Sequence, residues 1–410
     1  MRFLYSGELN HRLGWLLLIA ALAWAIWLDP WSFAERNPGA LAGSAKTAAM
    51  HAQSVVLVMA FLQLAIGATL VLSPPQWQQL NGAGLLGLGG MIVAAGHGLG
   101  SRPSAGAPVI LSGVLLSLLG LVICINDRRG KEHRDVTVIF WVFSAGMFLI
   151  GIMAMFELRP ELFLPAYLGP EDGFRLRLLR LARMALIALS VLTVLFLGLA
   201  KRACPQSRIV HWGRLAMLGG TIGIPSLLIA AAFTRVELTT LLPIPAYAML
   251  AGTLCGTQLA RRSSRSLEVW GWLLIAIGMA GGLFMGLYAF GTPWLTADWM
   301  GPYNDYGRRL IRLAHIDCVV FGLTSIFVAR ELDSQKEANP LRRLTAPLLI
   351  AGSAMTIAVI LLFVWTDLPA TLMSLGPAIV TTAVLFCAAG ALPGRLLKAA
   401  DAVGSPGVEP

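Results

Sequence analysis

Almost the whole chain consists of apolar runs that are long enough to cross a membrane. Hydrophobic residues make up 57% of the 410 residues and charged residues only 13%, whereas a soluble domain carries about a quarter charged residues. A helix that crosses about 30 Å of hydrocarbon needs roughly 20 mostly apolar residues. The sequence therefore predicts an all-α membrane protein with about twelve transmembrane helices and no soluble domain. The runs lie near positions 13–29, 48–72, 81–98, 107–125, 137–156, 180–200, 214–233, 243–260, 269–290, 311–330, 345–366 and 372–392.

The chain also repeats itself at a spacing of 132 residues. The block 177–182 reappears as 309–314 with five of six residues identical. The same spacing relates three prolines and three residues near helix starts: Pro38, Pro170 and Pro302, and His51, Arg183 and His315. A fixed period of this kind indicates that one unit occurs three times.

Three repeats divide the predicted helices into three groups of four. We expect these groups at about 5–136, 137–268 and 269–400, packed as a pseudo-symmetric ring within a single transmembrane domain over 1–400. Four is an even number, so each repeat starts on the same side of the membrane, and the repeats are parallel rather than inverted. The last ten residues, 401–410, are rich in Gly and Pro and predict a disordered tail.

The net charge of +10 is best explained by the orientation of the chain in a membrane. The basic residues are concentrated in alternate loops, as in chains that keep their positive loops in the cytoplasm. We therefore expect both termini in the cytoplasm, in the inner membrane of a bacterium. The lipid bilayer is then the partner of this charge, and no nucleic acid partner is expected. The outer loops before the sixth and tenth helices are also arginine-rich and break the pattern.

Two histidines, His51 and His315, occupy equivalent positions at the start of helices that enter from the outer side. Two neutral imidazoles that face one another across a pocket can hold a haem as its two axial ligands. Copper or another metal would normally need a third ligand close by, and neither helix supplies one. The alternative is that each histidine is a polar residue bonded to a neighbouring helix.

Arginines surround these positions. Arg308, Arg309 and Arg312 precede His315, and Arg312 shares its helix face because it is three residues away. On the sixth predicted helix, Arg180 and Arg183 occupy the matching places. Guanidinium groups suit the two propionate carboxylates of a haem. The alternative is that these arginines extend to the membrane interface.

Two further polar residues are possible site residues. His97 closes the third predicted helix and is a possible ligand, although a histidine at a helix end more often interacts with the last carbonyl groups. Asp317 lies two residues past His315, about 200° round the helix. An ionisable residue at membrane depth is costly and usually functional, so Asp317 could pair with an arginine or accept a proton.

Several other chemistries find no support in the sequence. The five cysteines contain no CxxC pair, so neither a disulfide framework nor a zinc site is predicted, and no CxxCH motif attaches a haem covalently. Phosphate-binding loops, nucleophile triads and zinc signatures are also absent from the sequence.

At this point the pattern resembles subunit I of the haem-copper oxidases, a ring of twelve helices with three-fold pseudo-symmetry. In that family a low-spin haem is held by one histidine from the second helix and one from the tenth, toward the outer side. The matching positions here are His51, within the stretch 47–52, and His315, within the stretch 312–317. The resemblance covers the whole chain in architecture and implies one non-covalent haem b.

The chain departs from the family at its second metal centre. The family carries a second histidine on the tenth helix, whereas Leu313 and Asp317 flank His315 here. The sixth helix has Arg183 in place of a copper ligand, and the paired histidines of the seventh helix are missing. We therefore expect no copper, and neither terminal oxidase nor nitric oxide reductase activity.

These features lead to one main hypothesis and two alternatives. The main hypothesis is a b-type membrane cytochrome with one bis-histidine haem, which transfers electrons or senses redox state or a gas. Its partners would be a quinol, a periplasmic electron-transfer protein or other membrane subunits. The first alternative is a multi-pass transporter or an anion- or lipid-binding protein without haem. The second alternative is a non-catalytic subunit that keeps an oxidase-like scaffold.

Overall fold

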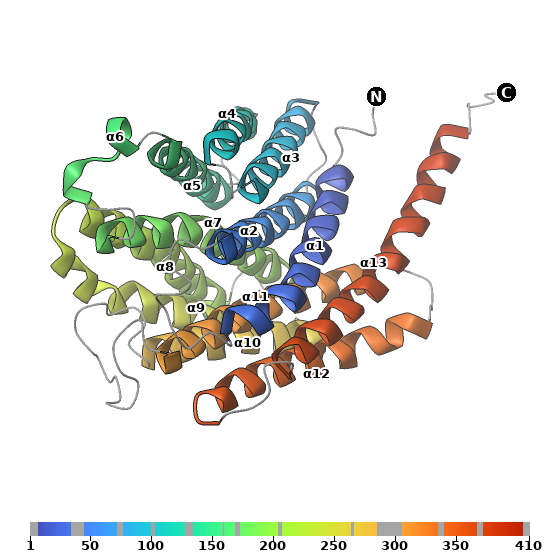
Figure 1. Cartoon of the computed structure of the whole chain (residues 1–410). Coiled ribbons are helices and arrows are strands. Elements are labelled where there is room, and N and C mark those ends of the chain that lie inside the picture. Colours follow the sequence, from blue (N-terminus) through green and yellow to red (C-terminus); the bar gives the residue numbers. More distant parts are fainter. Residues whose placement is uncertain are drawn as a thin grey trace.

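The computed structural model describes residues 7–33, 45–71, 77–99, 103–127, 134–158, 160–168, 173–203, 207–263, 266–284, 306–334, 340–366 and 372–404. These ranges are almost entirely helical and contain no strand (Figure 1). Apart from the four-residue helix α6 (Pro160–Phe163) and two short 3₁₀ helices, η4 (Ala166–Leu168) and η5 (Val236–Leu241), twelve long helices account for them. The long helices are α1 (Gly7–Phe33), α2 (Ala45–Val71), α3 (Trp77–Gly98), α4 (Pro103–Asp127), α5 (Arg134–Leu158), α7 (Phe174–Ala203), α8 (Arg208–Phe233), α9 (Pro243–Ser263), α10 (Ser266–Phe284), α11 (Tyr306–Ser334), α12 (Pro340–Phe363) and α13 (Leu372–Gly404).

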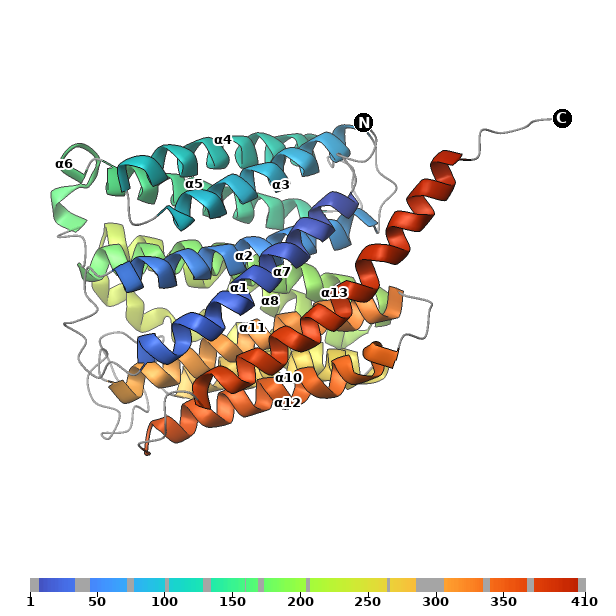
Figure 2. The ribbon, with the colours of Figure 1, turned by 45° about the vertical axis from the view of Figure 1, so that its right-hand side comes forward.

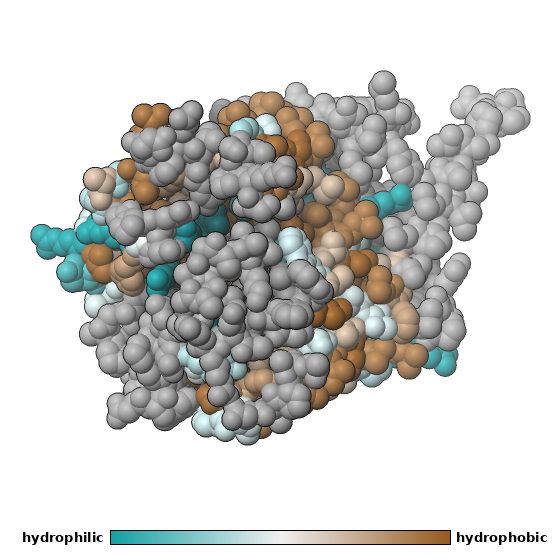
Figure 3. All heavy atoms as spheres, viewed as in Figure 1, coloured by the Kyte–Doolittle hydropathy of each residue, from teal (hydrophilic) through white to brown (hydrophobic). Residues whose placement is uncertain are grey.

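The apolar character of these helices identifies a multi-pass membrane protein. Within the described ranges, eight helical segments are long and apolar enough to cross a membrane. Shorter apolar segments occur in the other four long helices, α1, α2, α3 and α13. Figure 3 shows hydrophobic side chains over much of the surface that is not grey, and hydrophilic side chains gathered at the left-hand end, around α7, α8 and η5.

Each predicted apolar run overlaps most of one long helix, but several boundaries differ, and the ends of the runs 48–72 and 269–290 lie outside the described residues. The helices α7 and α11 begin at Phe174 and Tyr306, five or six residues before the predicted runs. The arginines that precede each run are therefore helical. At the other end of the chain, α13 continues to Gly404, four residues into the segment predicted as a tail. Pro38, Pro170 and Pro302 lie outside the described residues.

The long helices lie side by side with their axes roughly aligned (Figure 2). In that view α3, α4 and α5 form one side of the bundle, α10, α12 and α13 form the opposite side, and α2 and α7 lie between them. Neighbours in sequence pack together throughout, including α4 with α5 and α9 with α10. The first and last helices, α1 and α13, also contact one another, so the bundle closes on itself.

Glycines permit a close approach of α3 to α4. Three glycines on each helix recur every seven residues and meet in pairs, which places the two backbones in direct contact. A Cβ added at Gly113 would lie 2.7 Å from the carbonyl oxygen of Gly89, and one at Gly106 would lie 2.8 Å from that of Gly96. Small residues let membrane helices pack by dispersion and backbone contact. The three pairs are Gly82 with Gly120, Gly89 with Gly113, and Gly96 with Gly106.

Candidate functional site

His315 has a defined orientation in the structure. It lies nine residues into α11, or about 14 Å from the start of the helix, and its side chain is half-buried. The Nδ1 atom of His315 donates a hydrogen bond of 2.6 Å to the carbonyl oxygen of Gly278 in α10. Because Nδ1 then carries the ring proton, the lone pair of the neutral imidazole is on Nε2.

A glycine is needed where α10 meets this histidine. A Cβ added at Gly278 would lie 2.8 Å from the Cβ of Cys318 and 3.1 Å from the carbonyl oxygen of His315. Real side chains essentially never pack that closely, so a larger residue at position 278 would push α10 and α11 apart. The absent side chain of Gly278 therefore brings its carbonyl group within reach of the imidazole.

The predicted arginines lie in the N-terminal parts of α7 and α11. Arg183 and Arg308 are buried, with 6% and 7% of their surface exposed. Arg180, Arg309 and Arg312 are half-buried. Arg308, Arg312 and His315 follow the spacing i, i+4, i+7 and so share one face of α11. Arg309 points elsewhere, with its guanidinium carbon 5.7 Å from the centre of the Tyr306 ring.

Arg183 has the same place in α7 that His315 has in α11. Each residue is nine positions past the first residue of its helix, Phe174 or Tyr306. A permanently charged guanidinium therefore occupies, in α7, the depth at which α11 carries a neutral imidazole. Burial of such a charge requires strong partners, which makes this depth a polar layer within an apolar bundle.

The other predicted histidines have different outcomes. His51 lies in α2, but its side chain lies outside the described part of the structure. The expected approach of His51 to His315 therefore stays a prediction. His97 is buried, and its Nδ1 atom lies 2.9 Å from the carbonyl oxygen of Val93, one turn earlier in α3. This bond is to a carbonyl group of its own helix, and the possible role of His97 as a ligand stays a prediction.

The helices that carry His51 and His315 contact one another farther along. The rings of Phe61 in α2 and Phe327 in α11 stack with their centres 6.0 Å apart. Phe61 is ten residues past His51, and Phe327 is twelve residues past His315, so the two histidines lie at similar depths. However, Phe327 is 120° round α11 from His315, because twelve residues of an α-helix make three and one-third turns. The face of His315 is turned to α10 rather than directly to α2.

Asp317 is half-buried in α11, two residues past His315. Successive helical residues differ by about 100°, so its carboxylate lies on the side opposite the face shared by Arg308, Arg312 and His315. The structure therefore separates Asp317 from this face. The functional role of Asp317 stays a prediction.

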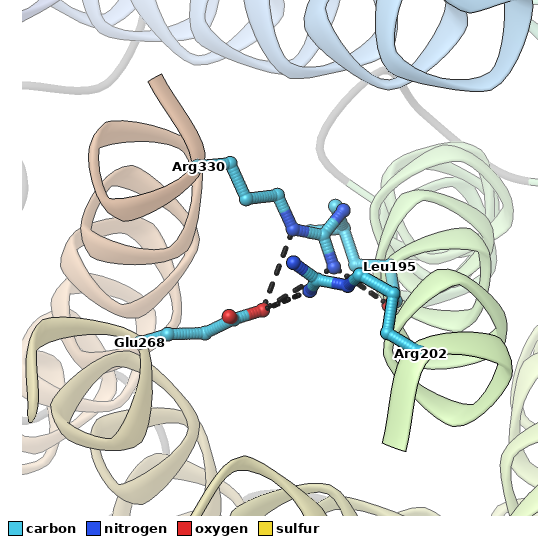
Figure 4. Close-up of polar contacts among 4 residues, drawn as sticks. All are labelled: Leu195, Arg202, Glu268 and Arg330. Carbon is cyan, nitrogen blue, oxygen red and sulfur yellow. Dashed lines mark hydrogen bonds and ion pairs between the residues drawn. The ribbon is translucent and has the colours of Figure 1, made fainter. Parts of the chain in front are cut away.

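A buried ion cluster, which sequence reasoning missed, lies at the other end of α11 (Figure 4). The carboxylate of Glu268, at the start of α10, is only 1% exposed. Its Oε1 atom accepts hydrogen bonds from Arg202 Nη2 at 2.8 Å and from Arg330 Nη2 at 3.4 Å. Arg330 also donates to the carbonyl oxygen of Leu195, at 3.0 Å. The cluster therefore joins α7, α10 and α11 in one polar contact.

The next residue of α11 makes a second buried pair. Glu331 is 2% exposed, and its Oε2 atom lies 2.7 Å from His11 Nε2 in α1. The indole nitrogen of Trp15 lies 3.0 Å from the same His11 nitrogen. A carboxylate can only accept, so we assign the His11 Nε2 proton to the bond with Glu331. The Trp15 ring then packs edge-on against the imidazole, at 83°.

The sequence pattern contained only a weak signal for these ion pairs. Arg330 and Arg202 stand at the ends of apolar runs, where they look the same as loop residues that set membrane orientation. Arg330 is the last residue of the predicted run 311–330, whereas α11 continues to Ser334 and holds Arg330 inside the helix. The carboxylates at 268 and 331 lie one residue outside the predicted runs 269–290 and 311–330, so hydropathy alone gave no reason to expect their burial.

The described residues do not gather three or more His, Cys, Asp or Glu side chains as a bare metal ion would require. A comparison with protein-family models found no match for the chain, and neither did comparisons with curated proteins and with solved structures.

Proposed function

We propose that this chain is an integral membrane protein that binds one b-type haem, with His315 and His51 as the axial ligands. The observation that carries the proposal is the hydrogen bond from His315 Nδ1 to the carbonyl oxygen of Gly278. A histidine that ligates a metal almost always donates its other ring N–H to a carboxylate, a backbone carbonyl or water, which fixes the tautomer and the ring orientation. His315 meets this requirement and has Nε2 as its ligating nitrogen.

The arginines near His315 fit a haem because their positive charge complements its propionate groups. A haem supplies one-electron redox chemistry and carries two propionate carboxylates. Arg308 and Arg312 lie one and two turns from His315 on the same helix face, where their guanidinium groups would bind carboxylates and hold them away from lipid. The polar layer at His315 and Arg183 would then position the anionic edge of the group toward the outer end of the bundle.

The faces of α7 and α11 that meet at Arg330 extend this arrangement. The side chain of Arg330 in α11 lies next to Gly198 in α7. A Cβ added at Gly198 would lie 3.7 Å from the Nη1 atom of Arg330. Arg312 is eighteen residues before Arg330, and Arg180 is eighteen residues before Gly198. Eighteen residues make five complete turns, so Arg312 and Arg180 occupy the mutually facing sides of the two helices. We therefore expect these two arginines to act on the same anionic group.

The proposal includes the finer architecture, in which twelve spans form three parallel repeats. The third helices of the units, α3, α8 and α12, begin at Trp77, Arg208 and Pro340, which are 131 and 132 residues apart. Contacts between units follow one rule: the fourth helix of each unit packs on the first helix of the next, as α4 on α5, α9 on α10 and α13 on α1. A three-fold ring accounts for both observations.

In this arrangement both termini face the cytoplasm of a bacterium, and the arginine-rich starts of α7 and α11 face the periplasm. The haem would therefore exchange electrons with a quinol in the bilayer, a periplasmic electron-transfer protein or another membrane subunit. A sensory role for redox state or a gas is the alternative use of the same group.

The burial of Arg183 and Arg308 favours a second candidate function. Two buried guanidinium groups at one end of the bundle would suit a protein that binds or transports an organic anion without haem. The colour of the purified protein separates the two candidates.

The test is a visible absorbance spectrum of the purified full-length chain, expressed with an adequate haem supply. The proposal predicts a b-type band in the reduced-minus-oxidised spectrum and about one haem per chain. Protein that is folded but colourless, and that stays colourless after addition of haem, would exclude the cytochrome and leave the anion-binding candidate.

A further inference from the structure

The helices α7, α8 and α9 carry a cluster of exposed cations at their shared end, opposite to the proposed haem. We call this cluster the basic end. It combines the last turn of α7, the first turn of α8 and the last turn of α9. All five of its cationic side chains are exposed. They are Lys201, Arg202, Arg208, Arg261 and Arg262.

A common packing layer shows that these cations lie at the same level. A Cβ added at Gly213 of α8 would lie 2.5 Å from the Phe196 ring of α7 and 2.9 Å from Cys255 of α9. Arg202, Arg208 and Arg261 are five or six residues beyond this layer, each on its own helix. At 1.5 Å per residue they lie about 8–9 Å beyond it, in the same direction.

The positive charge of the basic end is largely uncompensated within the described part of the chain. Only Arg202 has an acidic partner there, the buried Glu268. Lys201, Arg208, Arg261 and Arg262 form no ion pair with a described residue. Like charges so close together repel one another, and the partial charges of the helix ends, two C-termini and one N-terminus, offset only part of this repulsion. An anion bound from outside would relieve this repulsion.

An exposed apolar strip lies beside the cations. Trp212 is 65% exposed, and Arg208, Trp212 and Leu215 follow the spacing i, i+4, i+7 on one face of α8. Tryptophan is enriched where a membrane meets water, because its ring is apolar and its N–H can reach polar groups. In this order, Arg208 would contact the head group of a lipid, Trp212 the interface region and Leu215 the acyl chains.

We propose that the basic end binds anionic phospholipid through its phosphodiester head group. Guanidinium groups bind phosphate oxygens with charge-assisted, often bidentate hydrogen bonds. Each basic residue near a membrane surface contributes to attraction of anionic lipid, and the Trp212 face would contact the upper acyl chains. This binding does not depend on the proposed haem.

The test is native mass spectrometry of the purified full-length chain titrated with phosphatidylglycerol or phosphatidylcholine. Wild type should bind phosphatidylglycerol at least about tenfold more tightly, and less so at high salt. Arg261→Gln/Arg262→Gln and Lys201→Gln/Arg208→Gln should each weaken this binding about 25-fold, or about fivefold per charge. The matched control Arg235→Gln/Arg343→Gln removes two exposed arginines elsewhere and should change binding less than about twofold.

Three outcomes would overturn the proposal. Equal affinity for the two lipids would show that binding does not depend on the negative charge of the head group. An equal loss in the control variant would show that no particular site is involved. Displacement of the lipid by inorganic phosphate alone, or a clear preference for nucleic acid, would assign the basic end to a soluble anion. The salt dependence of lipid binding is measured on the wild-type protein. It therefore tests the proposal even if the variants misfold. The visible spectrum of the same samples reports separately on the haem.

Discussion

Because Gly278 has no side chain, α10 and α11 pack closely enough for its carbonyl oxygen to reach His315. Its carbonyl oxygen accepts the Nδ1 bond of the imidazole, and its Cα faces the Cβ of Cys318 across the contact between α10 and α11. The same residue therefore sets both the packing distance and the ring orientation. Substitutions at this position should affect helix packing and the histidine together.

Gly278→Ala should destabilise the protein by about 1–3 kcal/mol, the usual range for overpacking. The added methyl would lie 2.8 Å from Cys318 Cβ, so α10 must move away and lengthen the bond to His315. The measurement is the thermal unfolding midpoint in detergent, together with the position of any haem band. Gly281→Ala is the matched control three residues later, because its Cβ would meet nothing within 4 Å. Equal midpoints for the two variants would contradict the close contact.

Buried carboxylates at the other end of α11 hold the helix in place. Glu268 and Glu331 are almost fully buried; Glu268 binds the guanidinium group of Arg202, and Glu331 contacts the imidazole of His11. Breaking a buried pair by removal of one charge typically costs about 3–5 kcal/mol, because the other charge is left uncompensated. Arg202 is 42% exposed and can be hydrated, so the loss here belongs at the lower end of that range.

Glu268→Gln should therefore lower stability by about 3 kcal/mol, with the thermal midpoint again as the measurement. The exposed Glu237 provides the comparison, and Glu237→Gln should leave the midpoint nearly unchanged. An equal effect of the two substitutions would mean that Glu268 does not bind Arg330 and Arg202 inside the bundle.

At the scale of elements, the sequence predicted the positions of the helices better than their ends. The apolar runs marked every long helix, because burial in lipid leaves no other way to satisfy the backbone. The starts of α7 and α11 were placed too late, since arginine-rich turns lack the apolar signal. The predicted tenth run ends at Arg330, because hydropathy does not distinguish a paired charge within a helix from a charge at the end of one.

The candidate site was predicted only in its residue types. Equivalent positions for His315 and Arg183 could be read from the 132-residue spacing. The acceptor of the His315 bond could not, because Gly278 is 37 residues away in sequence and a backbone carbonyl leaves no mark in a sequence pattern. The partners of Glu268 and Glu331 come from long-range packing, which periodicity alone does not specify.

The glycine contact between α3 and α4 permits a prediction about a pair of elements. Gly113→Leu should separate the two helices, because its Cβ would lie 2.7 Å from the backbone of the partner helix. We expect a loss of at least about 2 kcal/mol, seen as a lower thermal midpoint and a lower yield of monodisperse protein. Gly219→Leu places the same side chain on α8 with nothing within 4 Å of its Cβ, and should be tolerated. Tolerance of both would show that α3 and α4 do not pack through glycine.

At the scale of the whole molecule, the contact between α1 and α13 closes the bundle. A ring of this kind gives every apolar helix neighbours on two sides, and it places α7 and α11 among the best-buried segments. The sequence spacing predicts three repeat units, whereas the contact between the first and last helices depends on long-range packing that the spacing does not specify.

The proposed twelve spans would place both chain ends on one side of the membrane. Alkaline phosphatase fused after position 410 should be inactive, because the enzyme needs the oxidising periplasm, and a fluorescent protein fused there should fluoresce. The control fusion after position 296, which follows an odd number of spans, should give active phosphatase. Active phosphatase at position 410 would exclude the twelve-span topology with cytoplasmic ends.

The most direct test of the central claim is the reduced-minus-oxidised spectrum of a matched set of histidine variants of the purified chain. His315→Ala and His51→Ala should each abolish the b-type band, because each removes one axial ligand. His97→Ala should retain it, because the proposal assigns both axial positions to other histidines. If His97→Ala removes the band while His315→Ala retains it, the assignment of the ligands is wrong.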